Sequence, residues 1–151
     1  MEQEQYADSK SYIERAIELE PEAADAWVYL AEAFIGLDET EKALDAYQRS
    51  ISFDFEQPDT LMAIANIYLE KGEYDDALFH YIQAITMDET LEYINMFIAV
   101  TYFKIGNVMD AIPYLKIALQ ESDQAASLFL ELCPEAVETL FLDEVNEKKL
   151  S

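Results

Sequence analysis

Residues 58–91 read PDTLMAIANIYLEKGEYDDALFHYIQAITMDETL, which predicts two short helices joined by a tight turn. Gly72 marks the turn, because glycine readily adopts the left-handed conformation that ends a helix. Apolar residues recur at helical spacing before it, at Leu61, Ile64, Ala65 and Tyr68, and after it, at Tyr74, Ala77, Leu78, Tyr81, Ala84 and Ile85. One such hairpin cannot bury its outer faces alone, so the pattern predicts neighbouring hairpins.

The same pattern recurs 34 residues away on each side, without gaps. The small residue Ala65 aligns with Ala31 and Ala99. The other matched positions are Ile64 with Leu30 and Ile98, Tyr68 with Phe34 and Tyr102, Ala77 with Ala43 and Ala111, Tyr81 with Tyr47 and Leu115, and Ala84 with Ser50 and Ala118. Gly72 aligns with Gly106 and, less well, with Asp38. An internal repeat of this length is typical of a solenoid.

The period and the pattern resemble the tetratricopeptide repeat (TPR) family. The residues that fit its signature, with alanine in the glycine position, are Trp27, Leu30, Ala31, Phe34, Ala43 and Tyr47. The resemblance implies an all-α fold, a right-handed α-solenoid of TPR-like helix hairpins. The proline that closes each family repeat appears only at Pro21; the later repeats have Phe55, Glu89 and Asp123 there.

We expect one domain over residues 1–151, with a half repeat at 1–23, full repeats at 24–57, 58–91 and 92–125, and capping helices at 126–151. The expected helices are 2–20, 24–37, 40–54, 58–71, 74–87, 92–105, 108–121, 124–132 and 135–149. The half repeat leaves one face of the first helix uncovered, around Tyr6 and Ile13. Either the chain continues a longer array, or another surface covers this face.

Charge limits the classes of partner. The chain has 32 acidic and 9 basic residues and a formal net charge of −23. A surface this acidic repels phosphate backbones and anionic lipids, so we expect no nucleic acid or membrane partner and an attraction to basic proteins. The single cysteine, Cys133, cannot form an internal disulfide, and no apolar run has membrane-spanning length. We expect a cytoplasmic protein, unless a longer chain carries a signal.

The residues that usually carry chemistry are few, so the sequence predicts no enzyme, no cofactor and no metal site. The only histidine, His80, lies one helical turn after Asp76, and two ligands alone make a weak metal site. The alternative is a partly exposed histidine beside a helical neighbour. Cys133 has no base nearby in the sequence and is expected to be a packed structural thiol.

A second stripe beside the core stripe predicts a groove that binds a partner. The resemblance implies that the first helix of each hairpin lines a concave face, where the family commonly binds peptides. The predicted groove residues are Val28, Glu32, Ile35, Met62, Asn66, Leu69, Tyr93, Met96, Val100 and Phe103. Some TPR proteins clamp acidic chaperone tails with polar and basic residues, which only Asn66 supplies here. We therefore expect a protein or peptide partner with basic and apolar residues.

The expected helix 92–105 is apolar on nearly every side, so something must cover it. Three covers are possible: the terminal helix 135–149, a second copy in a homodimer, or a partner peptide. The predicted function is a non-catalytic scaffold for protein–protein interaction. The alternative is a structural or self-association module, as a homodimer or as a segment of a longer array.

Overall fold

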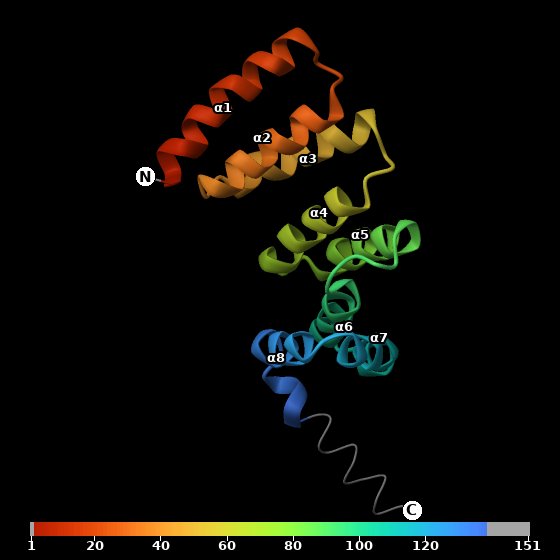
Figure 1. The fold of residues 1–151 in the computed structure, drawn as a ribbon. Helices are drawn as coiled ribbons and strands as arrows, with labels where there is room; N and C mark the ends of the chain where they lie inside the picture. Colours follow the sequence, from red (N-terminus) through yellow and green to blue (C-terminus); the bar gives the residue numbers. More distant parts are fainter. Residues whose placement is uncertain (1, 139–151) are drawn as a thin grey trace, which may run out of the picture.

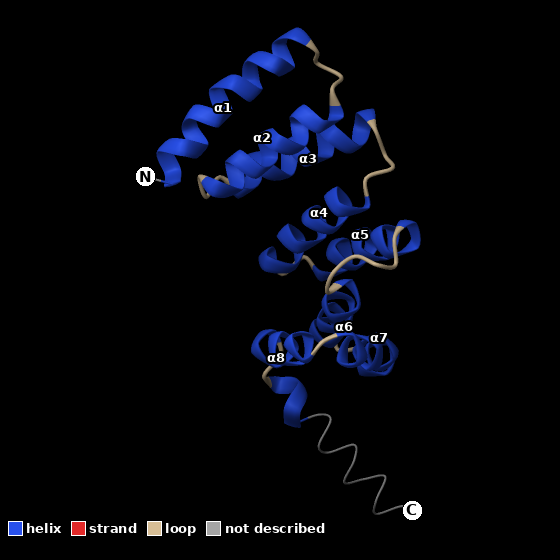
Figure 2. Cartoon of the chain, in the orientation of Figure 1, coloured by secondary structure: helices blue, strands red, loops and turns tan. Residues whose placement is uncertain are grey.

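The computed structural model describes residues 2–138, which form a stack of helices with the first and the last described helix at opposite ends (Figure 1). This range contains helices and no strand (Figure 2). The helices are α1 (Glu2–Leu19), α2 (Ala24–Gly36), α3 (Thr40–Phe53), α4 (Pro58–Lys71), α5 (Tyr74–Met87), α6 (Ile94–Ile105), α7 (Val108–Glu121) and α8 (Asp123–Leu132). Residues 135–138 are also helical, and the rest of the expected helix 135–149 lies outside the described residues.

Adjacent helices pair into hairpins, α2 with α3, α4 with α5, and α6 with α7. The hairpins stack through α3 on α4 and α5 on α6, while α1 packs on α2 and α8 packs on α6 and α7. The predicted all-α solenoid of helix hairpins is therefore confirmed. The expected ends of α4, α5 and α7 agree with the structure, and the ends of the other helices agree or differ by one residue, except at the start of α6.

Small residues occupy one repeated core position on each helix of a hairpin. Ala31, Ala65 and Ala99 share one repeat position on the first helices, and each is 0% exposed. Their partners on the second helices, Ala43, Ala77 and Ala111, are also 0% exposed. A methyl side chain at these points lets larger neighbours, such as Tyr81, fill the space beside the contact. The core is thus one repeated contact, as the sequence period predicts.

Three equivalent turns close the hairpins with a left-handed residue. Asp38, Gly72 and Gly106 have φ angles of 59°, 77° and 89°. After each of them the next amide donates back to the preceding helix, as in Glu73 N to Tyr68 O at 2.9 Å. The same bond joins Glu39 to Phe34 and Asn107 to Tyr102, both at 2.9 Å. Asp38 therefore performs the task of a glycine, at a cost in backbone strain.

The start of α6 differs from the prediction. The helix begins at Ile94, not at residue 92, because Tyr93 has a left-handed backbone with a φ of 63°. Asp88 organises the preceding loop, since its carboxylate accepts from the amide and the hydroxyl of Thr90 at 2.8 and 2.6 Å. Tyr93 donates its hydroxyl to Gln124 Oε1 at 2.9 Å. These contacts replace the first helical turn that apolar periodicity alone would predict.

The face of α1 that packs on α2 is the one expected to be uncovered. The Tyr6 ring lies against Gly36, where an added Cβ would come within 2.5 Å of it. Ile13 and Ile17 join the core cluster of α2 and α3. Tyr6 keeps 41% of its surface exposed, but both residues face α2. The prediction that Tyr6 and Ile13 mark an open face is therefore wrong, because the exposed Tyr12 lies about a third of a turn away around the helix.

The left-handed turns give a stability prediction. Gly106→Ala should destabilise the protein by about 1 kcal/mol, because an L residue is strained at a φ of 89° and the new methyl group meets no atom within 4 Å. Urea unfolding measures the change. Asp38→Gly is the converse control and should not destabilise the protein. An unchanged midpoint for Gly106→Ala would contradict the turn geometry.

Candidate protein-binding site

Two hollows lie side by side on the face formed by the first helices of the hairpins. The first hollow has a volume of about 350 Å³ and is lined by Ile35, Asp38, Thr40, Tyr47, Ala63, Asn66, Ile67 and Glu70. The second hollow has a volume of about 250 Å³ and is lined by Asn66, Leu69, Glu70, Tyr74, Phe97, Val100, Lys104 and Leu132. Asn66 and Glu70 of α4 line both, so the hollows share one wall. We call the pair the inner groove.

A buried tyrosine holds the shared wall in place. The Tyr81 hydroxyl donates to Asn66 Oδ1 at 2.5 Å, and its ring is 0% exposed. Burial, followed by the charge of Glu70, raises the pKa of Tyr81 well above its usual value, so the hydroxyl keeps its proton and remains a donor. The bond leaves the amide nitrogen of Asn66 as the group able to donate toward a ligand.

The equivalent pair one repeat earlier is Tyr47 and Glu32. Burial, and to a smaller extent the charge of Glu32, raises the pKa of Tyr47 to about 12. Glu32 is exposed and replaces the amide of Asn66 with a carboxylate at the same repeat position. Glu32, a predicted groove residue, is not among the residues that line the two hollows.

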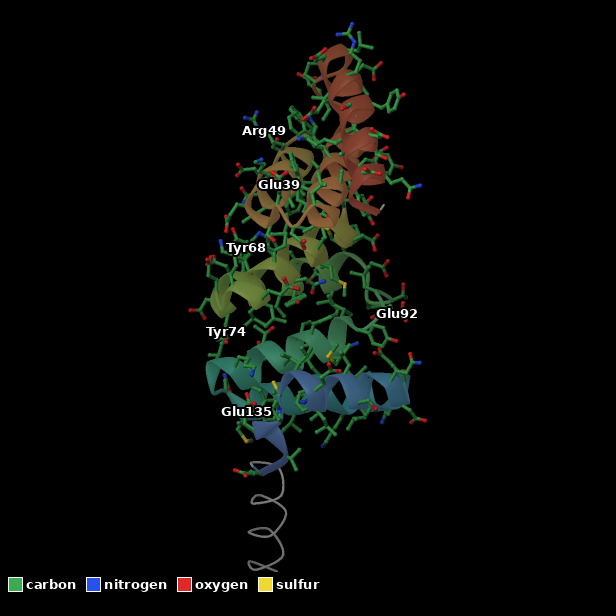
Figure 3. All side chains as sticks on the ribbon, turned by 90° about the vertical axis from the view of Figure 1, so that its left-hand side faces the viewer. Glu39, Arg49, Tyr68, Tyr74, Glu92 and Glu135 are labelled. Carbon is green, nitrogen blue, oxygen red and sulfur yellow. The ribbon has the colours of Figure 1, made fainter. Side chains whose placement is uncertain are left out.

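Charges around the inner groove are unevenly compensated. Among the described residues, Glu32, Asp38 and Glu70 form no ion pair. Lys104 bonds Glu135 at 2.8 Å, and this hydrogen bond is the main cause that raises the pKa of Lys104. Figure 3 shows Tyr74 and Glu135 on the same edge of the molecule. The cation of the second hollow is thus neutralised, while carboxylates of the shared wall and the first hollow remain available.

Four of the predicted groove residues, Ile35, Asn66, Leu69 and Val100, line the inner groove. Val28 and Met62 are half-buried and pack against the core beside it. Tyr93 lies elsewhere, in a separate hollow between the α5–α6 loop and the start of α8.

The last three members of the predicted stripe are buried, although Val100 also borders the second hollow. Met96, Val100 and Phe103 are 0, 1 and 8% exposed. The Phe103 ring meets the Phe129 ring of α8 edge to face, with 5.3 Å between the centroids. The structure does not present Met96 and Phe103 as open groove residues, because both are buried in the core cluster that α8 joins. This cover is a fourth possibility beside the three considered from the sequence.

Sequence reasoning missed part of the inner groove. Glu70 and Lys104 share the repeat position of Gly36, so the period of 34 could have pointed to them. Tyr74, Phe97 and Leu132 come from three different helices and carry no common sequence signal. Their meeting depends on where α8 docks.

The described residues offer little for catalysis or metal binding. No group of three metal-ligating side chains occurs among them. His80 directs Nδ1 to the backbone oxygen of Asp76 at 2.8 Å, and its ring stacks on Tyr68 at 5.4 Å. Cys133 is fully buried, and burial raises the pKa of its thiol to about 11. Within residues 2–138 no helix has both the length and the apolar character to cross a membrane.

Comparison with known families identifies the class of protein. One tetratricopeptide repeat model matches residues 1–59, and a second model of that family matches residues 60–92. The chain therefore belongs to the tetratricopeptide repeat family, whose fold serves as a protein–protein interaction module. A search of curated proteins found no match.

Solved TPR structures share the fold. MamA is 25% identical over 81% of this chain and 67% of its own, with a TM-score of 0.70. PilF of Pseudomonas aeruginosa is 19% identical over 90% of this chain and 64% of its own, with a TM-score of 0.71. YrrB, described as a TPR protein with an unusual peptide-binding site, is 22% identical over 82% of this chain and 66% of its own, with a TM-score of 0.70. The chain spans about two thirds of each.

The buried tyrosine beside the first hollow gives a pH prediction. Because the pKa of Tyr47 is about 12 in the folded protein, its contribution to the free energy of unfolding is fully present below pH 10. This contribution is lost as the pH rises toward 12. The loss is up to about 1.4 kcal/mol for each pH unit. Tyr47→Phe should therefore make the free energy of unfolding fall less steeply between pH 10 and 12.

Chemical denaturation at several pH values measures this slope. Tyr12→Phe, at a position 78% exposed, is the control for removing one hydroxyl group. Equal slopes for Tyr47→Phe and the parent protein would contradict the assigned cause.

Proposed function

We propose that the inner groove binds a peptide segment of a partner protein, and that the chain is a non-catalytic interaction scaffold. The observation that carries the proposal is the pair of adjoining hollows, one mixed and one largely apolar in its lining, with unpaired carboxylates along them. Leu69, Phe97 and Leu132 offer apolar contacts in the second hollow, and Ile35 offers them in the first. Apolar anchors set in pockets are a common mode of peptide recognition.

The charges favour a basic partner. Asp38 and Glu70 line the hollows without an ion pair among the described residues, and the whole chain has a formal net charge of −23. A lysine or arginine beside an apolar anchor would meet these carboxylates, whereas an acidic peptide or a nucleic acid would be repelled. A contact of this small size corresponds to an affinity in about the micromolar range.

An apolar contact of the inner groove can be removed without disturbing the core. Ile35 is 43% exposed, so Ile35→Asp should leave the helical content unchanged and weaken binding by tenfold or more. The measurement is a titration with basic, amphipathic peptides. Ile117→Asp on α7, at a position 44% exposed, is the matched control and should bind as the parent does. Equal affinities for Ile35→Asp and the parent would place the site elsewhere.

The acidic wall predicts a salt effect on association. Glu70→Lys should slow association and flatten its dependence on salt, because screening acts on exposed charges over about 8 Å at 0.15 M. Stopped-flow mixing at two salt concentrations measures both effects. Glu131→Lys on α8, also at an exposed carboxylate, controls for the change in net charge. A salt dependence altered equally by both changes would indicate overall charge and not the shared wall.

A further inference from the structure

Helix α1 has the residue pattern of a second helix of a hairpin. One period later, its Ser9, Tyr12 and Ala16 correspond to Ala43, Ala46 and Ser50 of α3. Those three α3 residues are 0, 2 and 0% exposed, and Ala43 and Ala46 belong to the core cluster shared with α2. Ser50 also donates its hydroxyl to the backbone oxygen of Ala24 in α2 at 2.9 Å. In a complete hairpin, this face is therefore where the first helix lies.

The matching face of α1 is exposed. Ser9 and Ala16 are exposed, Tyr12 is 78% exposed, and Leu19, one turn beyond Ala16, is 71% exposed. Helix α2 packs on a different side of α1, through Ile13 and Ile17. No helix in residues 2–138 lies over the stripe of Ser9, Tyr12, Ala16 and Leu19, which we call the outer stripe.

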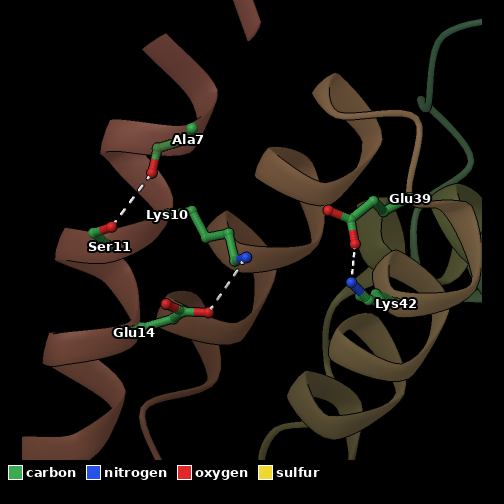
Figure 4. A network of polar contacts seen from close by, with 6 residues as sticks. All are labelled: Ala7, Lys10, Ser11, Glu14, Glu39 and Lys42. Atoms are coloured by element: carbon green, nitrogen blue, oxygen red, sulfur yellow. Dashed lines mark hydrogen bonds and ion pairs between the residues drawn. The ribbon is translucent and has the colours of Figure 1, made fainter. Parts of the chain in front are cut away.

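The charges beside the outer stripe are acidic. Asp8 lies next to it on the helix and Glu20 directly follows the last helical residue, and neither forms an ion pair within the described part of the chain. The two cations of α1 are already paired, Lys10 with Glu14 at 3.8 Å (Figure 4) and Arg15 with Glu18. An incoming segment therefore meets apolar side chains with free carboxylates toward both ends.

We propose that the outer stripe docks an amphipathic helix of a partner protein, in the position that α2 occupies on α3. The docked helix has a glycine or alanine at its centre, as α2 has Ala31, because Ser9 and Ala16 permit close approach while the Tyr12 ring needs room. Basic residues near its ends face Asp8 and Glu20. A second copy of this chain is disfavoured as the occupant, because each copy has a formal net charge of −23.

The chain itself supplies a probe. A labelled peptide of residues 58–71, PDTLMAIANIYLEK, is a first helix with Ala65 at its centre. It is compared with a version carrying Asp59→Lys and Glu70→Lys. The basic version should bind the 151-residue protein more tightly, and added salt should reduce the difference. Failure of both peptides to bind would overturn the proposal.

Substitutions at two alanines of α1 distinguish binding at the outer stripe from binding elsewhere on the helix. Ala16→Glu should weaken peptide binding at least tenfold, whereas Ala7→Glu, an exposed alanine on another face of α1, should not. Loss of binding with Ile35→Asp but not with Ala16→Glu would place the peptide in the inner groove and overturn the proposal. Sedimentation of the unliganded protein tests the second copy: self-association that Ala16→Glu abolishes would overturn the choice of a partner helix.

Discussion

The packing of two helices around buried alanines is the interaction on which the rest of the structure depends. Ala31 and Ala43 belong to one core cluster, and the equivalent alanines of the other two hairpins share a cluster in the same way, always fully buried. Because each hairpin then covers only one side of its helices, it must be covered by the next. The stack, its left-handed turns and its continuous core all follow from this requirement.

The same requirement explains the surfaces that remain open. In the inner groove, α2 and α4 border the first hollow and α4 and α6 border the second, and side chains only partly fill these spaces. Tyr81 and Asn66 hold the wall between the two hollows, and α8 packs Phe129 against Phe103 beside them. On α1, the face equivalent to the α3 surface that packs on α2 has no helix over it among the described residues, so the outer stripe is exposed.

Electrostatics gives both surfaces the same preference. Glu70 in the inner groove and Asp8 beside the outer stripe are unpaired in the described residues, while nearby Lys104 and Lys10 are paired with Glu135 and Glu14. Attraction between exposed charges adds little affinity but raises the rate of encounter and selects the sign of the partner. Apolar contacts must therefore supply the affinity, and charge decides which peptides or helices arrive.

The sequence by itself determined the helices, their pairing and the core. The spacing of apolar residues fixes the face of each helix, and the period of 34 repeats the alanine contact, so these features are local or nearest-neighbour in origin. Four residues of the inner groove were found in the same way. Tertiary structure alone decided that α8 buries Met96 and Phe103, that Leu132 joins Phe97 in the second hollow, and that α1 turns Tyr12 outward. These outcomes depend on the angles at which whole helices dock, which residue spacing does not encode.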